Sequence, residues 1–156
     1  MIHPILTHPD SVLRQVSTPV GASDDAARRL LDDMLETMYG AQGRGLAAIQ
    51  IGVPKRAVVI DVAWKEGAPQ PLFLLDPEIV WVSEAQATME ERCLSIPDTP
   101  RTVERPAHVL VRYRDRNGVE RIDDMSGMLA VVVQHEIDHL NGALILDYAA
   151  PDTTNR

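Results

Sequence analysis

Two histidines and a glutamate lie close together near the end of the chain, in the run His135-Glu136-Ile137-Asp138-His139. Residues four apart share one face of a helix, so His135 and His139 are expected to point the same way. Two imidazoles placed like this bind one metal ion. Glu136, between them in sequence, is placed to take a proton from water that the metal activates.

The alternative is a buried helix that carries two histidines by chance. The residues before the motif favour a metal, because they are apolar on nearly every side and polar groups inside a core need partners. The apolar residues are Met128, Leu129, Val131, Val132 and Val133.

A catalytic site of this kind has three protein ligands and one open position. One zinc-protease pattern places a third histidine where this chain has Ile145, and another needs a later glutamate, but none follows Glu136. Cys93 is the only cysteine in the chain. A lone cysteine is often just a small buried hydrophobic residue. Beside an incomplete metal site, we predict instead that Cys93 is the third ligand.

Two helices are predicted. The helix with the histidines starts after Ser126, which can cap it, and ends at Gly142, which suits a left-handed turn. An earlier helix runs from Ser23 or Asp24 to Tyr39 and carries one apolar stripe. Residues 1–22 are rich in turn formers and are expected to wrap around the domain as an extended segment, with a short turn near Asp10 to Arg14.

The residues between these helices favour strands. β-Branched or alternating runs predict strands over 56–62, 72–75, 78–83, 85–91, 103–114 and 119–123. Asn117-Gly118 is a strong hairpin signal between the last two. Strands joined as hairpins between helices indicate an α+β fold, with antiparallel sheets packed around the central helix that carries the histidines.

The segment Gly43 to Gly52 resembles the glycine pattern of dinucleotide-binding folds. That pattern needs a strand before it and a helix after it, whereas here a helix precedes it and a strand follows. We therefore reject nucleotide binding. A plain glycine turn remains the simplest alternative, but the side-chain amide of Gln50 could donate to a developing oxyanion.

The bulk composition suits a soluble globular protein. A length of 156 residues predicts one domain over 1–150 with a short tail at 151–156. The formal charge of −8 argues against DNA binding, and no apolar run approaches a membrane span. One cysteine and the absence of a visible secretory signal lead us to expect a cytoplasmic protein.

Three motifs now stand in order: Gly43-Arg44-Gly45-Leu46-Ala47-Ala48-Ile49-Gln50, Glu91-Arg92-Cys93-Leu94-Ser95, and His135 to His139. Together they resemble peptide deformylase over nearly the whole chain. The resemblance implies metal-dependent hydrolysis of the N-formyl group from the initiator methionine of nascent peptides. It also implies one divalent ion, natively Fe(II) and replaceable by Zn, Ni or Co.

The resemblance implies roles for individual residues. Cys93, His135 and His139 would bind the metal, and Glu136 would transfer the proton. Gln50 and the backbone N–H of Leu94 would hold the oxyanion. An ion pair between Asp138 and Arg105 would orient a neighbour. The residues assigned to substrate binding are Gly43, Arg44, Gly45, Glu91, Arg92, Val131 and Val132.

Two features depart from the family pattern. The family has Gly before its motif cysteine, where this chain has Arg92, and we expect that side chain to turn inward over the substrate cleft. Many members also continue into a long C-terminal helix implicated in ribosome docking, which puts ribosome association of this chain in doubt. The alternatives left open are a different N-acyl substrate, a non-catalytic metal-binding paralogue and, least favoured, a zinc endoprotease.

Overall fold

The computed structural model describes residues 1–148, so the predicted tail at 151–156 lies outside the described residues. In the described part of the chain, the structure has three short 3₁₀ helices, η1 (Ser11–Arg14), η2 (Ala48–Ile51) and η3 (Ile145–Asp147), and two α-helices, α1 (Asp25–Gly40) and α2 (Gly127–Leu140). The strands are β1 (Gly45–Ala47), β2 (Ala57–Ile60), β3 (Leu72–Val82), β4 (Gln86–Cys93), β5 (Ile96–Pro106), β6 (His108–Arg114) and β7 (Glu120–Ser126).

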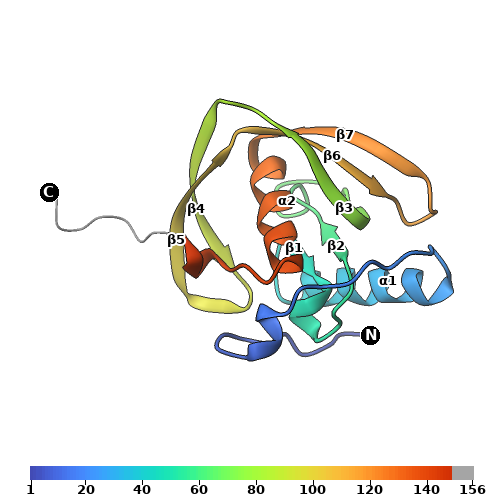
Figure 1. The fold of residues 1–156 in the computed structure, drawn as a ribbon. Coiled ribbons are helices and arrows are strands. Elements are labelled where there is room, and N and C mark those ends of the chain that lie inside the picture. The colour runs from blue at the N-terminus through green and yellow to red at the C-terminus, as the bar shows by residue number, and fades with distance from the viewer. Residues whose placement is uncertain (149–156) are drawn as a thin grey trace, which may run out of the picture.

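The strands form two antiparallel sheets. One sheet has five strands in the order β1-β2-β3-β6-β7, and the other is the β4-β5 pair. Helix α2 lies between the two sheets, while α1 lies below β1 and β2 (Figure 1). The predicted α+β class, with antiparallel sheets around the histidine helix, is confirmed. Within residues 1–148, no helix is long and apolar enough to cross a membrane.

Both faces of β2 are buried. Val58 and Ile60 pack toward α2, whereas Ala57 and Val59 pack toward α1. Helix α1 begins where its sequence indicates, because the Asp24 carboxylate accepts a hydrogen bond from Ala27 N at 2.9 Å. The sheet is therefore held between two helices, and this fixes α2 relative to the edge strand β1.

Two predicted strands differ from the structure. The runs at 72–75 and 78–83 form one strand, β3, with a bulge at Asp76, whose φ is +51°. Asp76 stabilises the bulge by accepting hydrogen bonds from Val20 N at 2.7 Å and Gly21 N at 3.1 Å and by pairing with Arg114. The bulge thereby ties the N-terminal segment to the sheet.

The run predicted as one strand over 103–114 is divided. Residues up to Pro106 belong to β5, and the chain enters the other sheet at His108. The first residues of β5, which starts at Ile96, were not predicted as a strand because Pro97 and Pro100 are typical of turns. Both strands of a two-stranded sheet are edges, and edges tolerate proline.

Gly142 adopts the predicted left-handed turn just after α2, which ends at Leu140. Gly142 has φ of +77°, and a Cβ there would lie 2.5 Å from the carbonyl oxygen of Arg14. Ser126 occupies the position before α2, but its side chain makes no capping bond. The N-terminal segment therefore packs directly against the turn after the histidine helix.

We predict that Gly142→Ala lowers the free energy of unfolding by at least about 2 kcal/mol, because left-handed strain adds to a backbone clash. Gly21→Ala is the matched control, since Gly21 has φ of +81° with nothing within 4 Å of its Cβ position. It should cost only about 1 kcal/mol. Urea denaturation compares the two variants, and equal losses would show that the contact with Arg14 is unimportant.

Candidate metal centre

Two histidines from α2 and one cysteine from the end of β4 converge in the middle of the molecule. The ligand atoms of Cys93, His135 and His139 all lie within 4.8 Å of one another, and the three residues are buried. Cys93 Sγ lies 3.3 Å from His139 Nε2. Ligand atoms of a tetrahedral site with bonds of 2.0–2.3 Å are roughly 3.5 Å apart. The spacing therefore fits one metal ion.

The surroundings of the two imidazoles shift their pKa values in opposite directions. Burial, aided by the charges of His135 and Arg105, lowers the pKa of His139 to about 3, so its ring stays neutral. Burial also acts to lower the pKa of His135, but the charge of Glu136 and contacts with Cys93 and Glu91 outweigh it and raise that pKa to about 10. A metal ion binding there would displace a proton.

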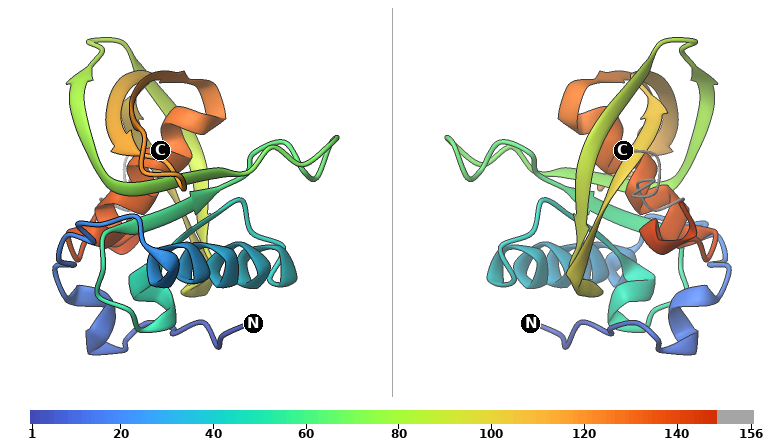
Figure 2. Two further views of the ribbon diagram at one scale, coloured as in Figure 1. Left: turned by 90° about the vertical axis from the view of Figure 1, so that its right-hand side faces the viewer. Right: turned by 90° about the vertical axis from the view of Figure 1, so that its left-hand side faces the viewer.

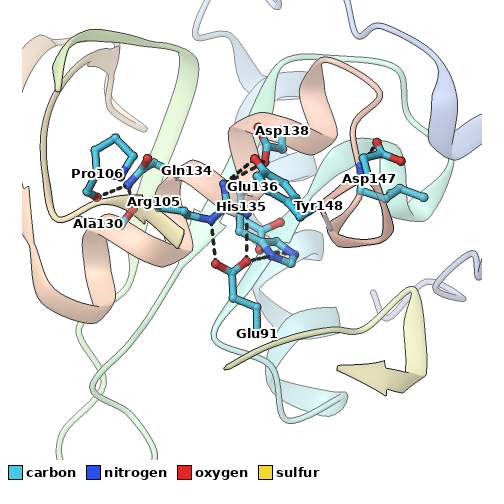
Figure 3. Close-up of polar contacts among 11 residues, drawn as sticks. Glu91, Arg105, Pro106, Ala130, Gln134, His135, Glu136, Asp138, Asp147 and Tyr148 are labelled. Atoms are coloured by element: carbon cyan, nitrogen blue, oxygen red, sulfur yellow. Dashed lines mark hydrogen bonds and ion pairs between the residues drawn. The ribbon is translucent and has the colours of Figure 1, made fainter. Parts of the chain in front are cut away.

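The orientation of His135 is set by a chain of ion pairs (Figure 3). Its Nδ1 lies 3.0 Å from Glu91 Oε1, which leaves Nε2 facing the cysteine side. Arg105 binds both oxygens of Glu91, at 2.7 and 2.9 Å, and donates to Asp138 at 2.9 Å. Tyr148 completes the group by donating to Asp138 at 2.7 Å. The ion pair between Arg105 and Asp138 was expected from the sequence, whereas Tyr148 was not.

Glu136 lies beside the three candidate ligands and is not one of that group. Its Oε2 is 4.0 Å from His135 Nε2, and its Oε1 is buried with no hydrogen-bond partner among residues 1–148. Burial raises the pKa of Glu136 to about 7, against the opposing charge of His135. Gly45 makes room for this carboxylate, because a Cβ at Gly45 would lie 2.6 Å from Glu136 Oε2. The site thus holds a carboxyl group able to exchange a proton near neutral pH.

Gln50 is fixed by hydrogen bonds at both ends of its amide. The Oε1 atom accepts from Ala47 N at 2.9 Å, and Nε2 donates to Ser95 Oγ at 3.0 Å. The same Nε2 lies 3.8 Å from Cys93 Sγ. The amide N–H group is therefore directed at Cys93, the candidate metal ligand, as a donor to a nearby oxyanion must be.

A cavity of about 530 Å³ opens beside these groups. Every residue assigned to the metal, proton transfer, the oxyanion or the substrate lines it except His139, and the assigned pair of Arg105 and Asp138 is also absent from the lining. The assigned residues lining the cavity are Gly43, Arg44, Gly45, Gln50, Glu91, Arg92, Cys93, Leu94, Val131, Val132, His135 and Glu136. Sequence reasoning missed Gln42, Lys65, Met89, Glu90, Pro97 and Met128. Only Met128 had a usable signal, since it lies one helical turn before Val131 and Val132.

Two assigned residues have surroundings that differ from expectation. The Arg92 side chain is 72% exposed and pairs with Glu90 at 3.1 Å, so it lies at the mouth of the cavity and does not turn inward. Glu91 lines the cavity, but both its oxygens are engaged by Arg105 and His135. No free carboxylate oxygen of Glu91 is left for a ligand in the cavity.

A buried cysteine and two histidines, beside a buried carboxyl group at an open cavity, define a metal-dependent hydrolase. The polypeptide deformylase family model matches residues 2–155. A peptide deformylase from Rhizobium meliloti is 56% identical over 94% of this chain and 84% of its own length. One from Phenylobacterium zucineum is 51% identical over 94% of this chain and 87% of its own.

Solved structures agree with the sequence relatives. The peptide deformylase from Ehrlichia chaffeensis in complex with actinonin superposes with a TM-score of 0.90 at 40% identity, over 96% of this chain and 90% of that one. A probable peptide deformylase from Synechococcus phage S-SSM7 also has a TM-score of 0.90, at 38% identity, over 94% and 99%. The chain belongs to the polypeptide deformylase family.

We predict that Glu91→Gln weakens Zn²⁺ affinity by 10- to 100-fold, because a neutral amide no longer fixes the ring of His135. It should also destabilise the fold by about 3 kcal/mol, because Arg105 keeps a buried charge with weaker compensation. Competition with a chromogenic chelator measures the affinity.

The matched control for that variant is Asp32→Asn, which weakens a two-bond carboxylate pair with Arg116 on the surface. It should cost less than about 1 kcal/mol and leave Zn²⁺ affinity unchanged. Unchanged affinity in Glu91→Gln would mean that Glu91 does not orient the ligand.

Proposed function

We propose that this chain hydrolyses the N-formyl group from formyl-methionine at the start of nascent peptides. The observation that carries the proposal is the buried Cys93, His135 and His139 set beside Glu136, with Cys93, His135 and Glu136 lining the cavity. Membership of the polypeptide deformylase family supports it. We further propose that one catalytic domain spans 1–150 and that it works in the cytoplasm on formylated chains.

Cys93, His135 and His139 would hold one divalent ion. When bound, the ion would polarise the formyl oxygen and lower the pKa of water in the open position. We propose Fe(II) as the native ion, with Zn, Ni or Co able to replace it. One thiolate and two imidazoles form a mixed donor set that does not select among these ions by itself.

Glu136 would act as the general base and then as the general acid. Its Oε1 carries no hydrogen bond within the described residues, so it is free to accept a proton from water. The same carboxyl group would then give that proton to the amine that leaves when the C–N bond of the formamide breaks. Burial brings its pKa close to neutrality, which favours both transfers.

The oxyanion that forms at the formyl carbon would be held by two donors. Gln50 Nε2 already points toward Cys93, and hydrogen bonds at both ends of its amide limit its movement. Leu94 lies at the turn between β4 and β5, where its backbone N–H would supply the second donor. Donors fixed in advance need no reorganisation during the reaction, so their stabilisation is realised in the transition state.

The peptide would pair with the free edge of β1. Strand β1 is the outermost strand of its sheet, and the carbonyl of Arg44 is already used by Asp61 N at 2.8 Å. Backbone groups alternate in direction along a strand, so the N–H and C=O of Gly45 face outward. A substrate backbone added there gains main-chain hydrogen bonds whatever its side chains are.

The methionine side chain would enter the part of the cavity lined by Val131, Val132 and Met128. These residues follow one face of α2 next to the reacting groups, and an apolar wall suits an unbranched thioether. Arg92, exposed at the mouth, would meet later residues of the peptide. Glu91, engaged by Arg105, would act on the reaction through His135 rather than touch the peptide.

Two alternatives predict different outcomes in a substrate panel. A deformylase hydrolyses formyl-Met-Ala and leaves acetyl-Met-Ala intact. An amidase for another N-acyl group reverses or broadens that preference. A non-catalytic paralogue binds metal stoichiometrically and turns over neither peptide. Protein purified without oxygen should be used, because an Fe(II) ion and its thiolate ligand are both open to oxidation.

We predict that Glu136→Gln retains one equivalent of metal and the wild-type fold but lowers kcat for formyl-Met-Ala by at least about 10²-fold, because proton transfer is lost. Metal analysis and steady-state kinetics on the same preparation check this. The control is Glu90→Gln, at the exposed mouth of the cavity, which should keep kcat within about twofold. Loss of metal from Glu136→Gln would show that Glu136 is a ligand and would overturn the role assigned to it.

A further inference from the structure

The connection between β2 and β3, residues 61–71, projects from the body beside the first residues of β1 (Figure 2). Its tip is exposed, but its base is ordered by one buried carboxylate. Asp61 Oδ1 accepts from Ala63 N at 3.0 Å and Trp64 N at 3.1 Å, and Oδ2 accepts from Gln70 N at 2.9 Å and Tyr39 O–H at 2.5 Å. The base is therefore anchored to α1.

This anchored base makes three contacts with the residues that precede β1. Trp64 Nε1 donates to the carbonyl oxygen of Gly43 at 2.9 Å. Asp61 N donates to the carbonyl oxygen of Arg44 at 2.8 Å, and the Arg44 guanidinium pairs with Glu66 at 2.7 Å. The Trp64 ring packs edge-on against Tyr39, with centroids 5.2 Å apart. Two consecutive carbonyl groups of the chain entering β1 are thus held by one connection.

The cavity gives the direction in which a peptide would run. Gly45 lies against Glu136, so the reacting bond belongs beside Gly45. The cavity continues along Arg44, Gly43 and Gln42, whereas Leu46 and Ala47 are fully buried. Residues after the formylated one would therefore lie beside Arg44 and Gly43, which are the residues held by Trp64 and Asp61.

Resting on the proposed function, we propose that Trp64 is a positioning residue for the peptide beyond its first residue. Gly43 N also donates to Met38 O at 2.9 Å, so both main-chain groups of Gly43 are engaged. The indole N–H thereby fixes Gly43 and, through Arg44, the backbone edge at Gly45 with which the substrate pairs, while Gly43 itself lines the cavity beside the second and third substrate residues. Trp64 need not touch the reacting atoms, and the metal ligands are on other elements. Its neighbour Lys65 is among the residues that line the cavity and would face the same part of the peptide.

Trp64→Phe tests the proposal, because it keeps a ring against Tyr39 but removes the N–H donor. We expect KM for formyl-Met-Ala-Ser to rise about fivefold with kcat within twofold. For formyl-methionine amide, which is too short to reach Gly43, kcat/KM should change by less than twofold. Metal content should equal that of the wild type. A merely structural defect would lower kcat/KM for both substrates together.

The matched control is Trp81→Phe, which changes the other tryptophan of the chain. Trp81 is 48% exposed on β3 and is absent from the cavity lining, so this variant should leave both substrates unchanged. Tyr39→Phe is the second test, because it removes one of the four hydrogen bonds to Asp61. It should raise KM for the tripeptide in the same direction by about twofold.

The outcomes separate this inference from the proposed function. If the wild type hydrolyses neither formyl substrate, the proposed function fails. If the wild type is active and Trp64→Phe leaves the tripeptide KM unchanged, or raises KM for both substrates equally, the positioning role is overturned. Should Trp64→Phe be unstable at the assay temperature, Tyr39→Phe alone decides, and an unchanged tripeptide KM in it overturns the proposal.

Discussion

One buried arginine joins both strands of the β4-β5 sheet to the helix that carries the histidines. Arg105 lies on β5 with its side chain 4% exposed, and it binds Glu91 on β4 and Asp138 on α2. A charge out of water is costly unless it is paired, so these carboxylates must stay where they are. Because Glu91 also contacts His135, the pairing that satisfies Arg105 positions one of the three proposed metal ligands. Cys93 lies two residues after Glu91, so the same pairing brings the thiol to the helix.

The centre of the site was predictable because its spacing is local. The i, i+4 histidines needed only helical geometry, and the apolar residues around them indicated that the helix is buried. Cys93 followed from the missing third ligand and from the resemblance to a family. The contacts of Trp64, Tyr148 and Ser95 were not predictable, since each joins residues 10 or more apart through tertiary packing. The orientation of Arg92 depended on an exposed pair with Glu90, which the sequence does not reveal.

In the fold, too, local features were predictable from the sequence and features that depend on tertiary contacts were not. Helix α1 was predicted from its cap and stripe, and the β6-β7 hairpin from Asn117-Gly118. The errors occurred where the chain bends or changes sheet. At Asp76 a bulge keeps one strand continuous, and its support comes from Val20 and Gly21, far away in sequence. Near Ala107 the chain passes from one sheet to the other. Ala107 N donates to Ala85 O at 2.9 Å, so the crossing is held by a tertiary hydrogen bond that leaves no turn signal in the sequence.

We propose that Cys93, His135 and His139 together hold the one ion on which hydrolysis depends. Titration of metal-free protein with Co²⁺ under anaerobic conditions tests it directly. We expect a tetrahedral cobalt spectrum with thiolate charge transfer that saturates at one equivalent, with deformylation of formyl-Met-Ala rising in parallel. Full activity in metal-free protein, or saturation without the thiolate band, would contradict the account.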